Sequence, residues 1–184
     1  MVEADKYVSL SAFKQNYLVR TDYKYEWKNG QLQREARMKP DEIYLIENIT
    51  TKFNTTPAYQ QGHRIISEAD RYLSSVATYR RPDAAYLTTN QIYYPDEDQT
   101  PALVVEVSSP SNSSEHNIGK MLDYFAAGVK VIWYIYPQIK QVWVHTDPKE
   151  VTVCCQSDLC RADPAIPDFS ISVDEIFYKP PRSE

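Results

Sequence analysis

The chain has 184 residues, of which 42% are hydrophobic, so it is long enough to bury one substantial core, and we expect a single domain over residues 1–184. Its formal net charge of −5 excludes a protein that holds nucleic acid by overall positive charge, because that mode needs many Lys and Arg contacts with phosphates. Any nucleic-acid contact should therefore be local. The chain contains no apolar run of the ~20 residues needed to cross a bilayer, and its first residues do not resemble a signal peptide, which predicts a cytoplasmic protein without membrane contact.

Three cysteines, Cys154, Cys155 and Cys160, lie close together in the C-terminal part of the chain. Three thiols cannot all pair, and vicinal cysteines are poorly placed to bridge each other, so we expect reduced thiols. A zinc site would need four ligands in paired short spacings, and the nearest histidine is the lone His145.

The N-terminal part is predicted to form a helix and a β-hairpin. Apolar residues return at helical spacing over residues 9–19, behind Ser9, which is a suitable N-cap residue. Residues 25–34 read as strand, turn and strand, because Asn29 and Gly30 supply the positive φ angles of a tight hairpin turn.

The middle of the chain is predicted to form a helix followed by two strands. Pro40 and the acids behind it open a segment over residues 41–53 whose apolar residues recur every three or four positions, which is typical of a helix. Residues 64–73 and 81–88 then predict strands.

A second long helix is predicted over residues 114–127, between a loop rich in helix-capping residues and Gly128. Its expected apolar stripe consists of Ile118, Met121, Leu122 and Phe125. Two aromatic-rich strands, an edge strand and a last helical turn are predicted at residues 130–136, 141–145, 151–155 and 173–177.

The most informative stretch is residues 100–110, where Glu106 interrupts a run of β-branched apolar residues. Such a run, bounded by prolines, predicts a central strand buried on both faces. An unpaired carboxylate there would carry a large desolvation penalty, so a metal or a cation should meet Glu106. Asp83 and Lys120 are the candidates for completing such a site.

Short motifs stand in a fixed order along nearly the whole chain. They are Tyr25-Glu26, Asn29-Gly30, Arg81-Pro82-Asp83, Val105-Glu106-Val107-Ser108-Ser109-Pro110-Ser111, Lys120 with Tyr124, Gly128-Val129, Val131-Ile132-Trp133-Tyr134 and Pro137. This ordered set resembles the Uma-type restriction endonuclease family, a branch of the PD-(D/E)XK nuclease superfamily. The resemblance implies an α/β fold with a restriction-endonuclease-like core, in which helices flank a mixed central β-sheet and an N-terminal helix and β-hairpin precede it.

The resemblance also implies a site. Asp83 and Glu106, on neighbouring strands, would hold Mg²⁺ together with the carbonyl of Val107, with Mn²⁺ as a possible substitute, and Lys120 would assist the attack of water on a DNA phosphodiester. The chemistry is consistent, because hard oxygen ligands suit Mg²⁺ and a nearby ammonium can orient water or stabilise developing charge.

Alternatives remain open for each residue. The superfamily usually places its lysine two residues after the acid, where this chain has Ser108, and on a helical wheel Lys120 lies nearly opposite the apolar stripe, as a solvated lysine would. Asp83 could be a turn residue at the start of a strand. Glu106 could instead form a buried ion pair with Arg80 or Arg81.

A further carboxylate of the site could come from the helix over residues 41–53. Glu42 and Glu47 are the candidates, and each could equally be an ordinary helix residue favoured by the helix dipole or by solvent. His116 and Asn117 stand where relatives often carry acids ahead of the lysine.

Two functions follow from these observations. The first is a Mg²⁺-dependent endonuclease, and the second is a non-catalytic nucleic-acid-binding or oligomerisation scaffold that keeps the nuclease fold. The chain has 15 tyrosines and three tryptophans, and symmetry is the usual way to place two nuclease sites on a duplex, so we expect a two-fold homodimer.

Overall fold

The structure is a computed structural model that describes residues 7–96, 99–108 and 113–181. Residues 109–111 of the motif after Glu106 lie outside the described part. In chain order the elements are α1 (Leu10–Asn16), β1 (Lys24–Lys28), β2 (Gln31–Glu35), α2 (Ile43–Phe53), α3 (Pro57–Gln60), β3 (Arg64–Ser67), β4 (Arg71–Leu73), the 3₁₀ turn η1 (Ser74–Val76), β5 (Thr78–Arg80), β6 (Ala84–Leu87), α4 (Thr89–Tyr93), β7 (Leu103–Val107), α5 (Ser114–Ala126), β8 (Val131–Tyr136), β9 (Gln141–Asp147), β10 (Glu150–Cys155), β11 (Leu159–Arg161), β12 (Ser170–Ser172) and α6 (Val173–Ile176).

The centre of the fold is a six-stranded sheet with the order β10-β9-β8-β7-β6-β3. The β7 and β8 strands run parallel, whereas the other neighbours are antiparallel, so the predicted mixed sheet is confirmed. The predicted central strand is β7, whose residues Leu103, Val104 and Val105 are fully buried. The predicted edge strand is β10.

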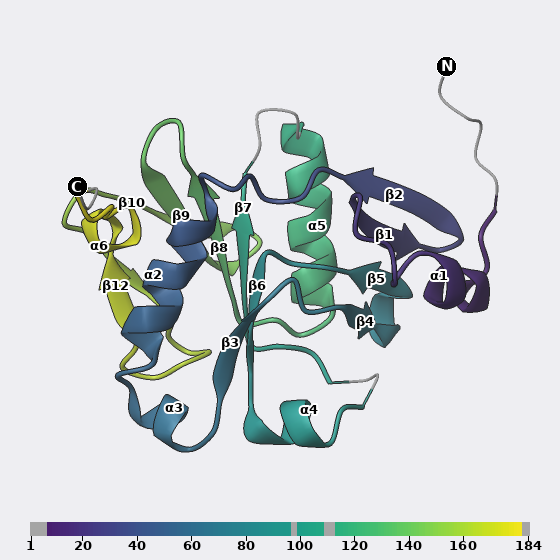
Figure 1. Ribbon diagram of the computed structural model, residues 1–184, viewed down its shortest axis with the longest axis horizontal. Helices are drawn as coiled ribbons and strands as arrows, with labels where there is room; N and C mark the ends of the chain where they lie inside the picture. The colour runs from purple at the N-terminus through teal and green to yellow at the C-terminus, as the bar shows by residue number, and fades with distance from the viewer. Residues whose placement is uncertain (1–6, 97–98, 109–112, 182–184) are drawn as a thin grey trace.

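Helices cover both faces of this sheet (Figure 1). On one face, Leu45 and Ile49 of α2 belong to the same core cluster as Val105. On the other face, Tyr124 of α5 belongs to a second cluster with Val104. The alternation of side chains along β7 therefore separates the two halves of the core.

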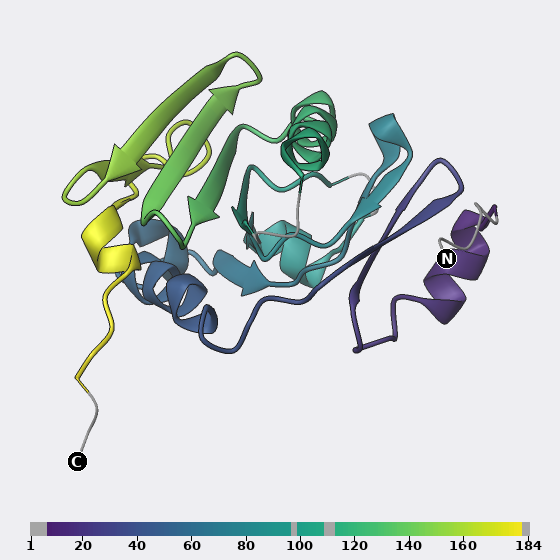
Figure 2. The same ribbon diagram turned by 90° about the horizontal axis from the view of Figure 1, so that it is seen from above.

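A four-stranded sheet with the order β2-β1-β5-β4 lies beyond α5, so this helix is sandwiched between two sheets (Figure 2). The aromatic face of β1 points away from α5 and packs with α1, where Phe13, Tyr25 and Trp27 form a separate cluster. The opposite face of β1 carries Lys24 and Glu26, which are buried toward the centre of the molecule. The buried charges of the hairpin therefore face α5 and the six-stranded sheet.

The predicted strand over residues 64–73 is wrong as a single element. It divides into β3 and β4, which belong to different sheets, and Glu68 between them has a positive φ of 48°. Likewise the strand predicted over residues 81–88 is only β6, while Thr78–Arg80 forms β5. The chain leaves the six-stranded sheet after β3, adds two strands to the other sheet and returns at β6.

The remaining predicted elements are confirmed with shifted ends. The first helix ends at Asn16, and its N-cap Ser9 accepts a hydrogen bond from the Ala12 N–H. The hairpin turn has φ of 48° at Asn29 and 89° at Gly30. The three cysteines are free thiols. Among the described residues, no helix has the length and apolar character of a membrane span.

Candidate active site

Asp83 and Glu106 lie side by side at the carboxyl end of β7. The β6–β7 register pairs Ala84 with Val105, which places Asp83, just before β6, next to Glu106. One oxygen of Asp83, Oδ2, accepts a hydrogen bond of 2.7 Å from the Val107 N–H. The prediction that these two acids come from neighbouring strands is therefore confirmed.

Lys120 reaches this pair from α5. Its Nζ lies 3.0 Å from Oε1 of Glu106 and 3.2 Å from Oε1 of Glu26, and the side chain is only 2% exposed. The alternative of a solvated Lys120 is therefore wrong. The predicted apolar stripe is also wrong in part, because Ile118 and Leu122 are 53% and 49% exposed.

Glu106 is held by a hydroxyl as well as by cations. The Tyr124 hydroxyl donates a 2.7 Å hydrogen bond to Oε1 of Glu106. Burial raises the pKa of Glu106, and the charge of Lys120 opposes this rise without cancelling it. Burial lowers the pKa of Lys120, whereas the charges of Glu106 and Glu26 raise it. The carboxylates have the larger combined effect, so the pKa of Lys120 lies above its usual value and the lysine keeps its charge.

Lys24 is a site residue that the sequence reasoning missed. Its Nζ lies 2.9 Å from Oδ1 of Asp83 and 3.7 Å from Oε2 of Glu106, and its side chain is 3% exposed. Burial lowers the pKa of Lys24, but the two carboxylates raise it more. A single cation therefore already contacts both predicted metal ligands.

Arg80 does not pair with Glu106, which contradicts the alternative drawn from the sequence. Its Nη1 lies 2.5 Å from Glu26 and its Nη2 lies 2.5 Å from Asp123. Arg81 is also engaged elsewhere, with its Nε 2.7 Å from Asp70. Both arginines pair with other acids. The cations that contact Glu106 are therefore the lysines Lys24 and Lys120.

Glu35, at the end of β2, is a third carboxylate that contacts the Lys120 ammonium. It lies 3.4 Å from Nζ of Lys120 and 2.7 Å from Nε2 of His116. Burial raises the pKa of Glu35, but Lys120 and His116 lower it more, so it stays below its usual value. His116 of α5 therefore contacts the same acid of the hairpin as Lys120 does.

Five carboxylates and their cations form one charge cluster. The carboxylates are Glu26, Glu35, Asp83, Glu106 and Asp123, and the cations are Lys24, Arg80 and Lys120, with the partly exposed Lys28 at the edge. His116, which lies against Glu35, adds a further positive charge when it is protonated.

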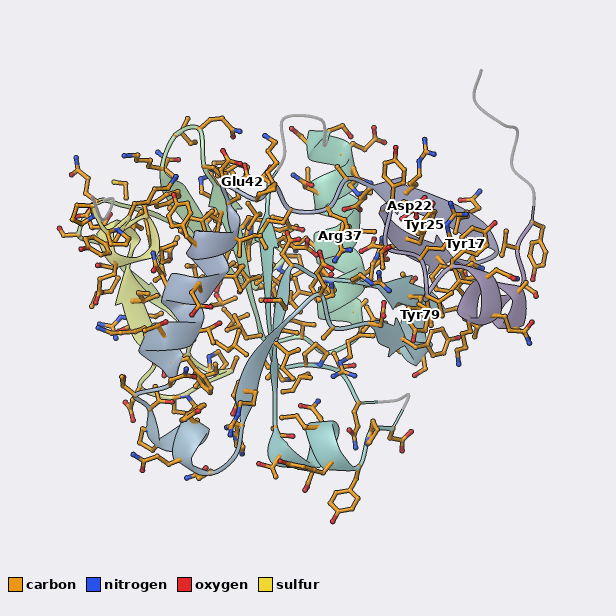
Figure 3. The ribbon with its side chains drawn as sticks, viewed as in Figure 1. Tyr17, Asp22, Tyr25, Arg37, Glu42 and Tyr79 are labelled. Carbon is orange, nitrogen blue, oxygen red and sulfur yellow. The ribbon has the colours of Figure 1, made fainter. Side chains whose placement is uncertain are left out.

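A cavity of about 50 Å³ opens beside the carboxylates, which is room for more than one water molecule. Its lining includes Lys24, Asp83, Glu106 and Val107, together with Glu42 and the segment 35–39 that leads from β2 toward α2. Figure 3 shows Arg37 and Glu42 along this connection. Of the two additional candidates, Glu42 lines the cavity, whereas Glu47 is exposed and is not among its lining residues.

The donor chemistry of this cavity fits Mg²⁺. Within the described residues, no three His, Cys, Asp or Glu side chains form a metal-binding group. Two carboxylates and the Val107 carbonyl would therefore have to be completed by water, and Mg²⁺ usually keeps several of its waters.

Known proteins provide a comparison for this arrangement. No curated protein matches the chain. A crystal structure described as a putative nuclease belonging to DUF820, from Anabaena variabilis ATCC 29413, has a TM-score of 0.76 and 17% sequence identity over 92% of this chain and 97% of that chain, which shows the same fold. A structure described as a DrdV–DNA complex reaches a TM-score of only 0.37, with 15% identity over 76% of this chain and 14% of that chain, and supports no argument. The Uma2 family model, described as "Putative restriction endonuclease", matches residues 10–174, and the chain therefore belongs to this family.

Proposed function

We propose that the chain is a Mg²⁺-dependent endonuclease that hydrolyses phosphodiester bonds of DNA with Asp83, Glu106 and Lys120. The observation that carries the proposal is the convergence of these residues: Nζ of Lys120, on α5, lies 3.0 Å from Glu106 of β7, and Asp83, just before β6, lies next to Glu106 beside a cavity that both acids line. Membership of the Uma2 family supports a nuclease.

Asp83 and Glu106 would hold Mg²⁺ with the Val107 carbonyl. The bound cation would polarise the phosphoryl group and lower the pKa of water. Asp83 is oriented for this role, because the Val107 N–H binds its Oδ2 and leaves Oδ1 facing Lys24. Glu106 is oriented in the same way by the Tyr124 hydroxyl on Oε1.

Lys120 would act on the water and the phosphate. Its ammonium remains charged next to Glu106 and Glu26, and it can donate hydrogen bonds to an attacking water or stabilise charge on a phosphate oxygen. Because the acids fix its position, little reorganisation would accompany the reaction.

Two cations at the mouth of the cavity support a polyanionic substrate. Arg37 and Lys39 line the cavity, and their side chains are 40% and 54% exposed. Such residues suit contacts with backbone phosphates, which position a duplex without reading its sequence.

The test is cleavage of double- and single-stranded DNA with Mg²⁺ or Mn²⁺. Glu106→Ala should abolish cleavage, because it removes a ligand. Lys120→Ala should leave metal binding in place but reduce turnover by roughly 10²–10³-fold, as the loss of one charge-stabilising group does. The exposed Glu47→Gln should match the wild type. Wild-type protein that cleaves neither DNA nor RNA with either metal, and binds no metal by calorimetry, would refute the proposal.

One observation favours the alternative scaffold. Lys24 contacts both carboxylates and offsets their charge, as it would in a purely structural ion cluster. The same measurements separate the two functions, because a scaffold would show neither metal binding nor cleavage at any Mn²⁺ concentration.

A further inference from the structure

Lys24 comes from a different sheet than the acids it contacts. It is the first residue of β1 in the four-stranded sheet, whereas Glu106 lies in the six-stranded sheet and Asp83 just before its strand β6. Its side chain is 3% exposed and ends between the two carboxylates. A lysine is rarely buried in this way unless its charge is paired.

The oxygens of the two acids are divided between partners. Oδ2 of Asp83 accepts from the Val107 N–H, and Oε1 of Glu106 faces Lys120 and the Tyr124 hydroxyl. The other oxygens, Oδ1 and Oε2, are the ones that Lys24 contacts, at 2.9 and 3.7 Å. A metal that binds both acids through these two oxygens would take the position of the Lys24 ammonium.

Two cations cannot share that position. An ammonium and a divalent ion a few ångströms apart in a buried site repel each other strongly. The stem of a lysine is flexible, so a divalent ion that takes this position can displace the ammonium.

We infer that Lys24 is a built-in counter-ion of the Asp83–Glu106 pair, which holds the two carboxylates together in the metal-free protein and which a divalent cation must displace. This inference rests on the proposed function. Lys24 then sets the affinity for the metal and takes no part in catalysis. It stabilises the protein without metal and weakens the binding of the metal.

The experiment is calorimetric titration of MnCl₂ into wild type, Lys24→Met and the matched control Lys28→Met. Lys28 lies on the same strand and loses the same charge, but its Nζ pairs with Asp123 at 2.8 Å. Lys24→Met should bind Mn²⁺ at least about tenfold more tightly than wild type, a difference of about 1.4 kcal/mol, while Lys28→Met should stay within about twofold. Thermal unfolding should show Lys24→Met less stable than wild type without metal and stabilised more by Mn²⁺.

Three outcomes count against the inference in distinguishable ways. Equal or weaker Mn²⁺ binding by Lys24→Met, with binding by wild type intact, overturns the counter-ion and leaves the nuclease proposal standing. Equal gains in Mn²⁺ affinity for Lys24→Met and Lys28→Met would mean that any lost positive charge nearby has the same effect, and this would also overturn the inference. Absence of binding by all three proteins overturns the inference and the metal site together.

A measurement on the wild-type protein covers the case in which Lys24→Met does not fold. Crystals soaked in MnCl₂ should show anomalous density between Asp83 and Glu106, with Nζ of Lys24 moved out of hydrogen-bond distance from Oδ1 of Asp83. Manganese bound there with the 2.9 Å contact preserved would overturn the inference.

Discussion

Replacement of Arg80 by methionine should cause a large loss of stability, because this residue links three elements inside the molecule. Its side chain, in β5, is 2% exposed and binds Glu26 of β1 and Asp123 of α5. Methionine keeps most of the volume and removes the charge, so the effect isolates the ion pairs from the packing.

The structure sets the size of this effect. Removing one partner of a buried ion pair costs about 3–5 kcal/mol, because a buried charge is left uncompensated. Glu26 would keep Lys120, and Asp123 would keep Lys28, so neither carboxylate is left alone. We therefore expect the lower end of the range, about 3 kcal/mol.

Urea unfolding followed by tryptophan fluorescence measures the difference. With a slope of roughly 2 kcal/mol per molar, the midpoint of Arg80→Met should fall by about 1.5 M relative to wild type. The control is Lys52→Met, which removes an ion pair with Glu175 in which the side chains are 43% and 47% exposed, and which should cost less than about 1 kcal/mol. Equal midpoints for the two variants would refute the reasoning that burial decides the value of these pairs.

Glu106→Gln should keep the free energy of unfolding within about 1 kcal/mol of wild type or raise it, because Lys24 still pairs with Asp83 and Lys120 still pairs with Glu26 and Glu35. A loss above about 3 kcal/mol, measured by urea unfolding, would contradict this. Glu42→Gln, which changes a cavity residue, should weaken Mn²⁺ binding by calorimetry more than Glu47→Gln does, and equal affinities would exclude Glu42 from the site. The pKa of Glu175 is lowered to about 2 by its hydrogen bond with Lys52, so this acid should contribute less than about 1 kcal/mol of stability above pH 4.5, lost as the pH falls toward 2; Glu175→Gln should flatten that part of the pH–stability curve. Light scattering at micromolar concentration should give the mass of two chains, and a monomer would contradict the predicted homodimer.

Glu106 could be found from the sequence because its setting is local. A carboxylate among β-branched residues is costly wherever the strand is buried, and β7 is buried on both faces. The partner Asp83 followed from the ordered motifs, and the sheet register then brought it next to Glu106. These parts of the site depend on strands that are adjacent in the sheet.

The other parts depend on contacts between sheets, which a pattern along one segment does not contain. The helical wheel of α5 assumed one buried face, but the helix has a sheet on each side, so Lys120 and Asp123 are buried on the second face. In the hairpin, Lys24 and Glu26 alternate with aromatic residues as they would on a strand with one face in water. The available signal for Glu26 was its place in the Tyr25-Glu26 motif, whereas Lys24 carried none.

The contacts that join the hairpin to α5 also fix the order in which a growing chain can complete the charge cluster. Lys28 and Asp123 are 95 positions apart, and Glu35 and Lys120 are 85 apart. During synthesis, β1 and β2 therefore emerge long before the helix that covers their charged face. A chain that stops before α5 would carry Glu26, Glu35 and Glu106 without Lys120, the cation that all three carboxylates share in the complete protein.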